Sequence, residues 1–191
     1  KTVTFAGGIH PSYNKERTAA LAVKTIDAPE EVVIPLIQHI GAPAKAVVAK
    51  GDEVLVGQVV GEPGGFVSTF IHASVSGKVK AVESRPSMGG SAVPSVVIAN
   101  DGEMNCAELE GIGDGWADAD AEKLKDLILK GGLVGMGGAA FPTHVKLSPP
   151  KEKPIDAVIL NGAECEPYLT ADHRIMVESP AEVVTGLRIV L

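Results

Sequence analysis

Short runs of β-branched and aliphatic residues, broken by glycine and proline, fill the sequence from residue 32 to residue 100. They include residues 32–36, 47–49, 54–56 and 96–99. Runs of this length are typical of strands, and the glycine and proline between them favour turns. We therefore predict an all-β module over residues 32–100. No run approaches the roughly 20 apolar residues that a membrane-spanning helix needs.

Two segments of this region form a related pair. Residues 49–58 read AKGDEVLVGQ, and residues 72–82 read HASVSGKVKAV. They resemble the two halves of a biotinyl- or lipoyl-type barrel-sandwich module, in which such sequences form two quasi-symmetric turns. In carrier proteins of that type, the modified lysine lies on the hairpin between the halves. Residues 63–71 contain no lysine, so we predict the fold without the carrier function.

Length and charge limit the classes of protein to consider. A chain of 191 residues corresponds to one or two domains, and 45% hydrophobic with 21% charged residues is typical of a soluble globular protein. The 17 Lys and Arg against 24 Asp and Glu give a net charge of -7. This charge disfavours broad attraction to nucleic acid or to an anionic lipid surface. A small molecule or a protein is the expected partner.

The two cysteines, Cys106 and Cys165, lie far apart, and the sequence contains no CxxC motif. An iron–sulfur cluster or a zinc site therefore cannot be built from this chain alone, and we predict no metal ligands in it. We expect Cys165 to be a small packed residue, the alternative being a redox-sensitive thiol.

After residue 119 the pattern changes from strands to helices. Residues 120–130 place apolar side chains on one helical face, and Gly131 and Gly132 should end that helix. The apolar run 155–160 is predicted to be a buried parallel strand. Residues 179–182 (SPAE) predict another helix start, with Ser179 as N-cap, a first-turn proline and Glu182 in a capping box. Together these elements predict an α/β unit whose ligand lies beyond the carboxyl end of the strand.

The glycine-rich segment between helix and strand is a candidate anion site. Gly135, Gly137 and Gly138 would let main-chain N–H groups approach a phosphate, and Lys146 would supply a positive charge. The alternative is an ordinary tight turn, because the short GxGG pattern does not follow a predicted strand.

The polar segment after the predicted strand is the second candidate. An amide and two carboxylates follow the predicted strand, at Asn161, Glu164 and Glu166. Sheets of this kind bind their ligands beyond the carboxyl ends of the strands. A ribose or an aromatic heterocycle offers hydrogen-bond donors to such groups. Alternatively, the carboxylates cap the following structure or face solvent.

Four long stretches resemble one protein family. They are residues 4–11 (TFAGGIHP), 34–62, 132–150 (GLVGMGGAAFPTHVKLSPP) and 159–174 (ILNGAECEPYLTADHR). They are similar to the C subunit of the Rnf electron-transport complex. The resemblance implies a membrane-associated, ion-translocating complex that exchanges electrons between NADH and ferredoxin. The C subunit would be its peripheral NADH-facing component, carrying FMN and, farther along its chain, two [4Fe–4S] clusters.

The second half also resembles the flavin-binding subunit of respiratory complex I. By that resemblance, Gly135, Gly137, Gly138 and Lys146 hold FMN phosphate and ribose. Asn161, Glu164 and Glu166 contact flavin and nicotinamide, and Phe141 lies near the NADH adenine. The sequence departs from the complex I pattern at Met136, Ala163 and Tyr168. These departures fit the Rnf subfamily.

The resemblance implies hydride exchange between NADH and FMN, followed by single-electron transfer, with no catalytic residue assigned in the chain. The histidines at positions 39, 72, 144 and 173 receive no catalytic role. A second hypothesis is a cofactor-free scaffold or docking protein related to the A subunit of sodium-pumping quinone reductases. The expected location is peripheral, at the cytoplasmic face of the inner membrane, among other Rnf subunits and without a membrane span.

The expected fold class is therefore mixed α+β: a β-rich barrel-sandwich module followed by an incomplete α/β flavin-nucleotide-binding domain. We expect an N-terminal arm (1–31), the β module (32–100), a linker (101–119) and the truncated FMN/NADH domain (120–191). We also expect the chain to be a fragment of a longer protein. By itself the fragment should be inactive and should bind FMN weakly or not at all.

Overall fold

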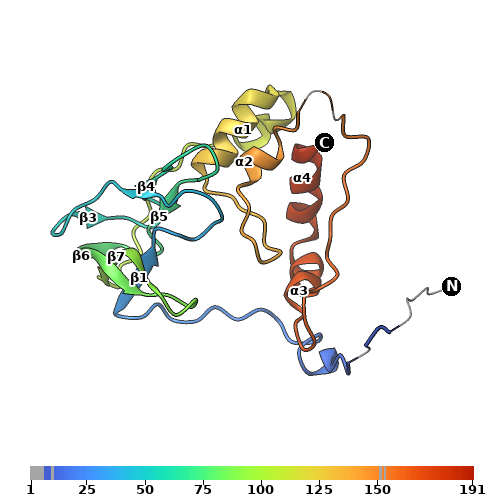
Figure 1. The fold of residues 1–191 in the computed structure, drawn as a ribbon, viewed down its shortest axis with the longest axis horizontal. Helices are drawn as coiled ribbons and strands as arrows, with labels where there is room; N and C mark the ends of the chain where they lie inside the picture. Colours follow the sequence, from blue (N-terminus) through green and yellow to red (C-terminus); the bar gives the residue numbers. More distant parts are fainter. Residues whose placement is uncertain (1–6, 10, 151, 153) are drawn as a thin grey trace. The chain divides into compact units, whose positions relative to one another are not determined.

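The computed structural model describes residues 7–9, 11–150, 152 and 154–191 (Figure 1). The chain forms two compact units. The larger unit covers residues 26–155, and the smaller unit joins the chain up to residue 25 with residues 156–191. The larger unit therefore holds the β region together with the glycine-rich segment.

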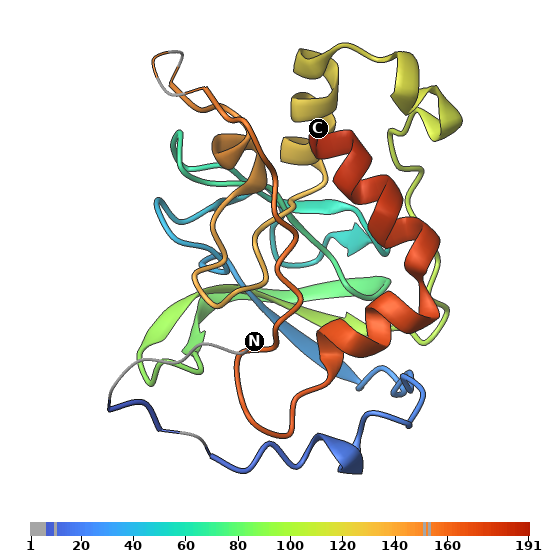
Figure 2. The same ribbon diagram turned by 90° about the vertical axis from the view of Figure 1, so that its right-hand side faces the viewer.

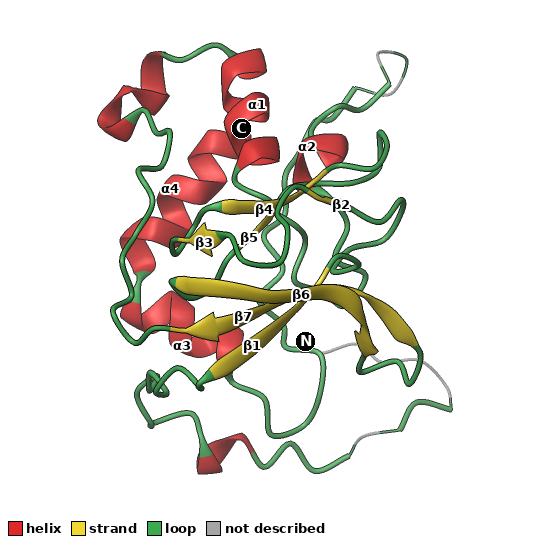
Figure 3. Cartoon of the chain, turned by 90° about the vertical axis from the view of Figure 1, so that its left-hand side faces the viewer, coloured by secondary structure: helices red, strands yellow, loops and turns green. Residues whose placement is uncertain are grey.

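The main sheet of the larger unit is antiparallel and has four strands. In spatial order these are β1 (Glu31–Pro35), β7 (Ala92–Asn100), β6 (Gly77–Pro86) and β3 (Glu53–Val54). The long strands β6 and β7 run side by side from Gly77 opposite Asn100 to Pro86 opposite Ala92 (Figure 3). A register shift between Val79 and Ala81 interrupts their pairing, as a β-bulge does.

A second antiparallel sheet has three short strands. Their order is β2 (Lys45–Ala46), β4 (Val59–Glu62) and β5 (Ile71–His72). Side chains from both sheets bury one apolar cluster, made by Ile34, Leu36, Ala44, Val54, Val60, Ile71, Ala73, Val75, Val79, Val96 and Ile98. Most of these are small or β-branched, which suits the close packing of short strands. The strands thus lie where the sequence predicts an all-β module.

Two pairs of reciprocal hydrogen bonds join the two related segments. Gly51 N donates to Val79 O and Val79 N donates to Asp52 O, each at 2.8 Å. Gly57 N donates to Ala73 O and Ala73 N donates to Gln58 O, also at 2.8 Å. The KGD and GQ ends of the first segment therefore pair with the second segment in the same way, as two quasi-symmetric turns require.

The larger unit continues with η2 (Gly113–Asp118), α1 (Ala121–Lys130) and α2 (Thr143–Lys146). Asp120 caps α1, because its Oδ1 accepts a bond of 2.9 Å from Lys123 N. At the other end, Gly132 has φ 68°, Gly132 N donates to Leu129 O, and Leu133 N donates to Ile128 O. This is a Schellman motif, so the predicted helix and its glycine stop are both confirmed.

The smaller unit contains η1 (Lys15–Arg17), α3 (Ala171–Glu178) and α4 (Pro180–Val190). The helix start at Pro180 is confirmed, but the Ser179 side chain makes no capping bond. Ser179 is the only residue between the two helices, and its N–H donates to Ile175 O as the end of α3. Its conformation is therefore set by the helix that ends there. In the described residues, no helix is both long and apolar enough to cross a membrane.

The prediction of a buried strand at residues 155–160 is wrong. These residues have no strand conformation and all are exposed, with Ile159 at 87% and Leu160 at 55%. A parallel strand exists only when neighbouring strands satisfy its N–H and C=O groups. Among the described residues, none forms a ladder with this segment, so an apolar run alone does not make it a strand.

Candidate functional site

The glycine-rich segment folds as a small loop with paired stems. Thr143 N donates to Leu133 O at 3.0 Å, and Gly135 N donates to Phe141 O at 2.9 Å. A bridge between Val134 and Pro142 lies between these two bonds. We call residues 133–143 the glycine loop. Its tip, residues 136–139, is exposed.

The glycine loop is open where a ligand would approach its backbone. A Cβ atom built at Gly137 or at Gly138 would meet no atom within 4 Å, and Gly138 has φ 100°. Lys146 Nζ lies 3.5 Å from the position that a Cβ of Gly135 would take. An ammonium group beside an unobstructed glycine backbone is suited to an anion such as a phosphate. The residues present therefore fit the phosphate end of a nucleotide cofactor.

The short helix α2 follows the loop directly and carries Lys146 with His144. Burial lowers the pKa of His144, an effect that the backbone of Phe66 partly offsets. The Nδ1 atom of His144 is buried and has no hydrogen-bond partner in the part of the chain that the structure describes. Phe141 is half-buried, and its carbonyl is already used by Gly135.

The second predicted group, in the smaller unit, lies on a loop before α3. Asn161 Oδ1 accepts a 3.0 Å bond from Ala163 N, which closes a local turn. Glu164 has φ 63°, and its Oε1 accepts a 2.9 Å bond from His173 N in the first turn of α3. The Glu166 side chain is exposed. Glu164 is thus a helix-capping residue, the alternative that its sequence context left open.

The N-terminal arm holds this loop through backbone contacts. Lys15 Nζ donates to Glu166 O at 3.2 Å and to Leu169 O at 2.6 Å. Thr18 Oγ1 donates to Tyr168 O at 2.9 Å, and the Arg17 guanidinium lies 5.6 Å from the centre of the Tyr168 ring. Figure 2 shows the arm, in blue, beside the orange-red loop. These partners are up to 154 positions apart, so no local pattern predicts them.

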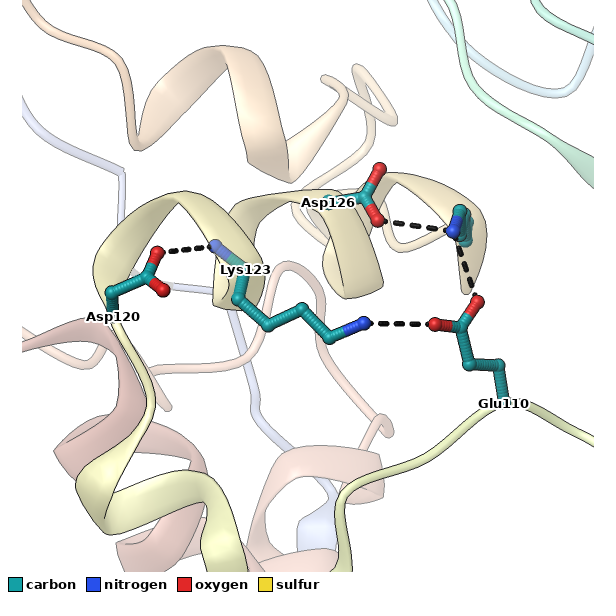
Figure 4. Close-up of polar contacts among 5 residues, drawn as sticks. Glu110, Asp120, Lys123 and Asp126 are labelled. Carbon is teal, nitrogen blue, oxygen red and sulfur yellow. Dashed lines mark hydrogen bonds and ion pairs between the residues drawn. The ribbon is translucent and has the colours of Figure 1, made fainter.

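An ion-pair cluster ties the segment before η2 to α1 (Figure 4). Glu110 Oε1 lies 2.8 Å from Lys123 Nζ, and Glu110 Oε2 lies 2.9 Å from Lys130 Nζ. Asp126 pairs with Lys130 at 3.1 Å. Hydrogen bonds from the two lysines lower the pKa of Glu110 to about 2. Glu110 also borders a pocket of about 680 Å³ between α1 and the barrel strands.

The predicted residues therefore fall into two groups. Gly135, Gly137, Gly138, Phe141 and Lys146 lie together on the glycine loop and α2, in the larger unit, and Asn161, Glu164 and Glu166 lie on one loop of the smaller unit.

Cys165 is exposed, so the expectation of a packed residue is wrong. Its neighbour Glu164 has a left-handed backbone, and the loop lies on the surface. Among the described residues, no three His, Cys, Asp or Glu side chains form a metal-binding group.

Two family models match the chain. Residues 3–103 match the RnfC barrel sandwich hybrid domain, and residues 128–191 match the Nuo51 FMN-binding domain. The first match covers the β module, and the second covers the glycine loop and the polar loop before α3. The predicted fold class, a barrel-sandwich module followed by part of an FMN-binding domain, is therefore confirmed.

Curated relatives match nearly the whole chain, and all three described here are C subunits of oxidoreductase complexes. The chain is 53% identical over 189 residues to that of the Na(+)-translocating ferredoxin:NAD(+) oxidoreductase complex of Acetobacterium woodii. It is 45% identical over 188 residues to the proton-translocating counterpart of Clostridium ljungdahlii. It is 39% identical over 189 residues to that of the ion-translocating oxidoreductase complex of Pseudomonas aeruginosa. Each match covers 98% of this chain but only 42%, 41% and 24% of the respective relative.

Proposed function

The chain belongs to the RnfC family, the C subunits of ion-translocating oxidoreductase complexes, and we propose that it forms part of the NADH-facing, FMN-binding subunit of such a complex. The observation that carries this proposal is the open glycine loop with Lys146 beside Gly135. It lies inside the segment that matches an FMN-binding domain. The A. woodii and C. ljungdahlii relatives are named as subunits of ferredoxin:NAD(+) oxidoreductase complexes.

In this proposal the two groups of residues bind different parts of the ligands. Gly137 and Gly138 offer backbone N–H groups to the phosphate and ribose of FMN, and Lys146 offers an ammonium. The N–H of Gly135 already donates to Phe141 O, so Gly135 contributes the space beside its backbone in which Lys146 Nζ lies. Asn161, Glu164 and Glu166 orient flavin and nicotinamide, and Phe141 lies near the adenine of NADH. FMN, when bound, supplies hydride exchange with NADH and single-electron transfer onward. The chain itself supplies binding, orientation and charge.

Glu164 has one carboxylate oxygen for each of two tasks. Its Oε1 accepts the bond from His173 N, which leaves Oε2 to accept a hydrogen bond from a ribose hydroxyl or a carboxamide. A carboxylate has about four acceptor positions, so the two tasks are compatible. The capping bond holds the side chain in one direction, which lowers the entropy cost of binding.

The wider setting is also part of the proposal. The relatives are more than twice as long as this chain, and we assign two [4Fe–4S] clusters of the longer protein to sequence outside these 191 residues. Its partners are the other subunits of the complex, with NADH as donor or product and ferredoxin reached indirectly. We place it peripherally at the cytoplasmic face of the membrane. We also retain the division into arm, β module, linker and FMN/NADH domain.

Two substitutions in the full-length protein test the proposal. Lys146→Gln should weaken FMN binding about tenfold, because a charge-assisted hydrogen bond contributes about 1.5–3 kcal/mol. Glu164→Gln should abolish most NADH oxidation and leave FMN affinity within about threefold, because the amide oxygen still accepts from His173 N but the carboxylate charge is gone. Flavin fluorescence measures the affinity, and NADH absorbance measures the turnover.

Lys50→Gln is the matched control, because Lys50 is an exposed lysine at a barrel turn, and it should change neither quantity. Normal turnover in Glu164→Gln would remove Glu164 from the site. A full-length protein that contains no flavin and binds none would favour the alternative of a cofactor-free docking protein.

A further inference from the structure

The hairpin between the two halves of the barrel contains two buried polar side chains, and one of them has its partner outside the barrel. We call residues 63–72 the barrel hairpin; it follows β4 and includes β5. Ser68 is 0% and Thr69 is 2% exposed. Ser68 Oγ accepts a 3.1 Å bond from Gly64 N within the hairpin. Thr69 Oγ1 instead donates to Leu129 O in the last turn of α1 at 3.0 Å.

The direction of the Thr69 hydroxyl is set by a second contact. Thr69 N donates to His39 Nε2 at 3.3 Å, and His39 is only 5% exposed. Nδ1 of His39 lies 3.2 Å from Ile40 O, so the ring fits the tautomer that carries its proton on Nδ1. Backbone and side chain of Thr69 are thus both anchored, and its hydroxyl is aimed at the helix end.

His72, the last residue of the hairpin, makes a similar contact. Its ring lies beside the glycine that ends α1, with two ring atoms 3.2 Å from the position of a Gly132 Cβ. Burial lowers the pKa of His72, and the backbone of Lys130, the last residue of α1, partly offsets this effect. The final carbonyls of a helix have no partners within it. The Thr69 side chain therefore gives Leu129 O a partner from the barrel, beside the bond that Gly132 N makes to the same oxygen.

The helix end also lies very close to the hairpin backbone. A Cβ atom at Gly132 would be 2.5 Å from Phe70 O and 3.2 Å from two atoms of the His72 ring. Gly132 is the residue before the glycine loop, so the first stem of the loop starts from this contact. After the second stem, His144 on α2 faces the backbone of Phe66. The barrel hairpin thus contacts the chain on both sides of the glycine loop.

We propose that the barrel hairpin positions the glycine loop, with Thr69 and His72 as positioning residues that fix the end of α1 from which the loop starts. The hairpin has no lysine to modify. Instead it gives the barrel module a role in nucleotide binding by setting where Gly135, Gly137 and Gly138 lie. The link to FMN rests on the proposed function of the loop; the positioning itself does not.

The test replaces the hydroxyl of Thr69 in the full-length protein. Thr69→Val keeps the shape but removes the donor and leaves Leu129 O with one bond fewer, whereas Thr69→Ser keeps the hydroxyl. In hydrogen exchange measured by mass spectrometry, Thr69→Val should speed exchange of peptides over residues 133–143 about tenfold. Thr69→Ser should stay within about twofold of the parent. Exchange of β6 and β7 should not change in either variant, which shows that the barrel is folded.

FMN affinity, measured by fluorescence on the same proteins, separates the two proposals. Both proposals are supported if Thr69→Val speeds hydrogen exchange of the loop about tenfold and weakens FMN binding about tenfold, and if Thr69→Ser restores the parent values of both quantities. Faster hydrogen exchange of the loop with unchanged FMN affinity supports the proposal that the hairpin positions the loop, and it counts against the loop as the FMN site. Unchanged loop exchange in Thr69→Val overturns the positioning.

A second pair of variants, at His72, tests the same proposal if Thr69→Val does not fold. His72→Phe removes the imidazole nitrogens beside the end of α1 and keeps a ring, and His72→Gln keeps a hydrogen-bond donor. The loop should exchange faster in His72→Phe and be restored towards the parent rate in His72→Gln. Equal loop exchange in both variants and the parent would also overturn the proposal.

Discussion

At the scale of single residues, Glu164 shows how one side chain can serve structure and ligand together. Its carboxylate caps α3 through His173 N, and its backbone has φ 63°. A non-glycine residue in this region costs about 1–2 kcal/mol, so the surrounding contacts must stabilise it. The cap and the arm contacts to residues 166–169 supply such stabilisation. A Glu164→Ala variant would therefore mix loss of the cap with loss of ligand contact, which is why Glu164→Gln is the sharper substitution.

Glu110 gives a prediction about acid stability. Its pKa is near 4.5 in a free side chain and about 2 in the folded chain, because Lys123 and Lys130 hydrogen-bond it. Between these values the unfolded chain binds more protons, so the free energy of unfolding rises with pH. The stabilisation is complete above about pH 5 and disappears as the pH falls from 4.5 towards 2.

Urea unfolding of the parent and of Glu110→Gln measures this effect. The parent should be more stable at pH 7, and the difference should shrink steadily below pH 4.5. Because the cluster is exposed, 1 M NaCl should also reduce the difference at pH 7. A difference that is independent of both pH and salt would contradict the ion-pair explanation.

At the scale of elements, the two barrel turns depend on glycine for different reasons. Gly77 has φ 144°, and a Cβ there would lie 1.9 Å from the backbone oxygen of Ala99 on β7. Gly51 has φ 102°, but a Cβ there would meet nothing within 4 Å. The first position therefore combines backbone strain with a close approach between strands, and the second involves strain alone.

Replacing each glycine by alanine separates these costs. Gly51→Ala should destabilise the barrel by about 1–2 kcal/mol through backbone strain. Gly77→Ala should cost about 3 kcal/mol or more, because β6 must also move away from β7. Thermal unfolding followed by circular dichroism measures both. Equal losses in the two variants would show that the contact with Ala99 O relaxes freely.

At the scale of the whole molecule, apolar burial is confined to one unit. Every buried apolar side chain among the described residues lies in the larger unit, in the barrel core between Ile34 and Ile98 or at Pro142. In the smaller unit, the described buried residue is Thr170, and the described contacts between the arm and the loop before α3 are hydrogen bonds and one cation–π pair. Local opening is cheaper where few apolar side chains are buried, so the smaller unit should be the less stable of the two.

This distribution predicts weak flavin binding by the 191-residue chain. Binding that uses Asn161, Glu164 and Glu166 depends on the smaller unit, where few apolar side chains are buried and local opening is cheap, so that opening competes with binding. Titration with FMN, followed by flavin fluorescence, should show no saturation below about 100 μM, since a Kd of that size already corresponds to about -5.5 kcal/mol. The full-length protein is the positive control. Saturable binding at micromolar FMN would contradict the prediction.

Much of the architecture can be predicted from local patterns. The runs at residues 32–36, 54–56 and 96–99 overlap β1, β3 and β7, Asp120 and Gly132 mark the ends of α1, and Pro180 marks the start of α4. The run at residues 47–49 is not a strand, and β2 ends just before it at Ala46. In each case the signal and the structure lie within a few residues of each other. The failure at residues 155–160 has the opposite cause, because a strand needs partners that its own sequence does not contain.

The sequence alone determined the family, the barrel with its lysine-free hairpin, and the residue types of the candidate site, since each depends on a motif that is continuous in the chain. Only the tertiary structure decided how those motifs are supported. The bonds from Lys15 to Leu169 O and from Thr69 to Leu129 O join residues 154 and 60 positions apart. Such contacts form between a side chain and a backbone carbonyl, a group that every residue has. They therefore leave no pattern in the sequence and arise only when packing brings the segments together.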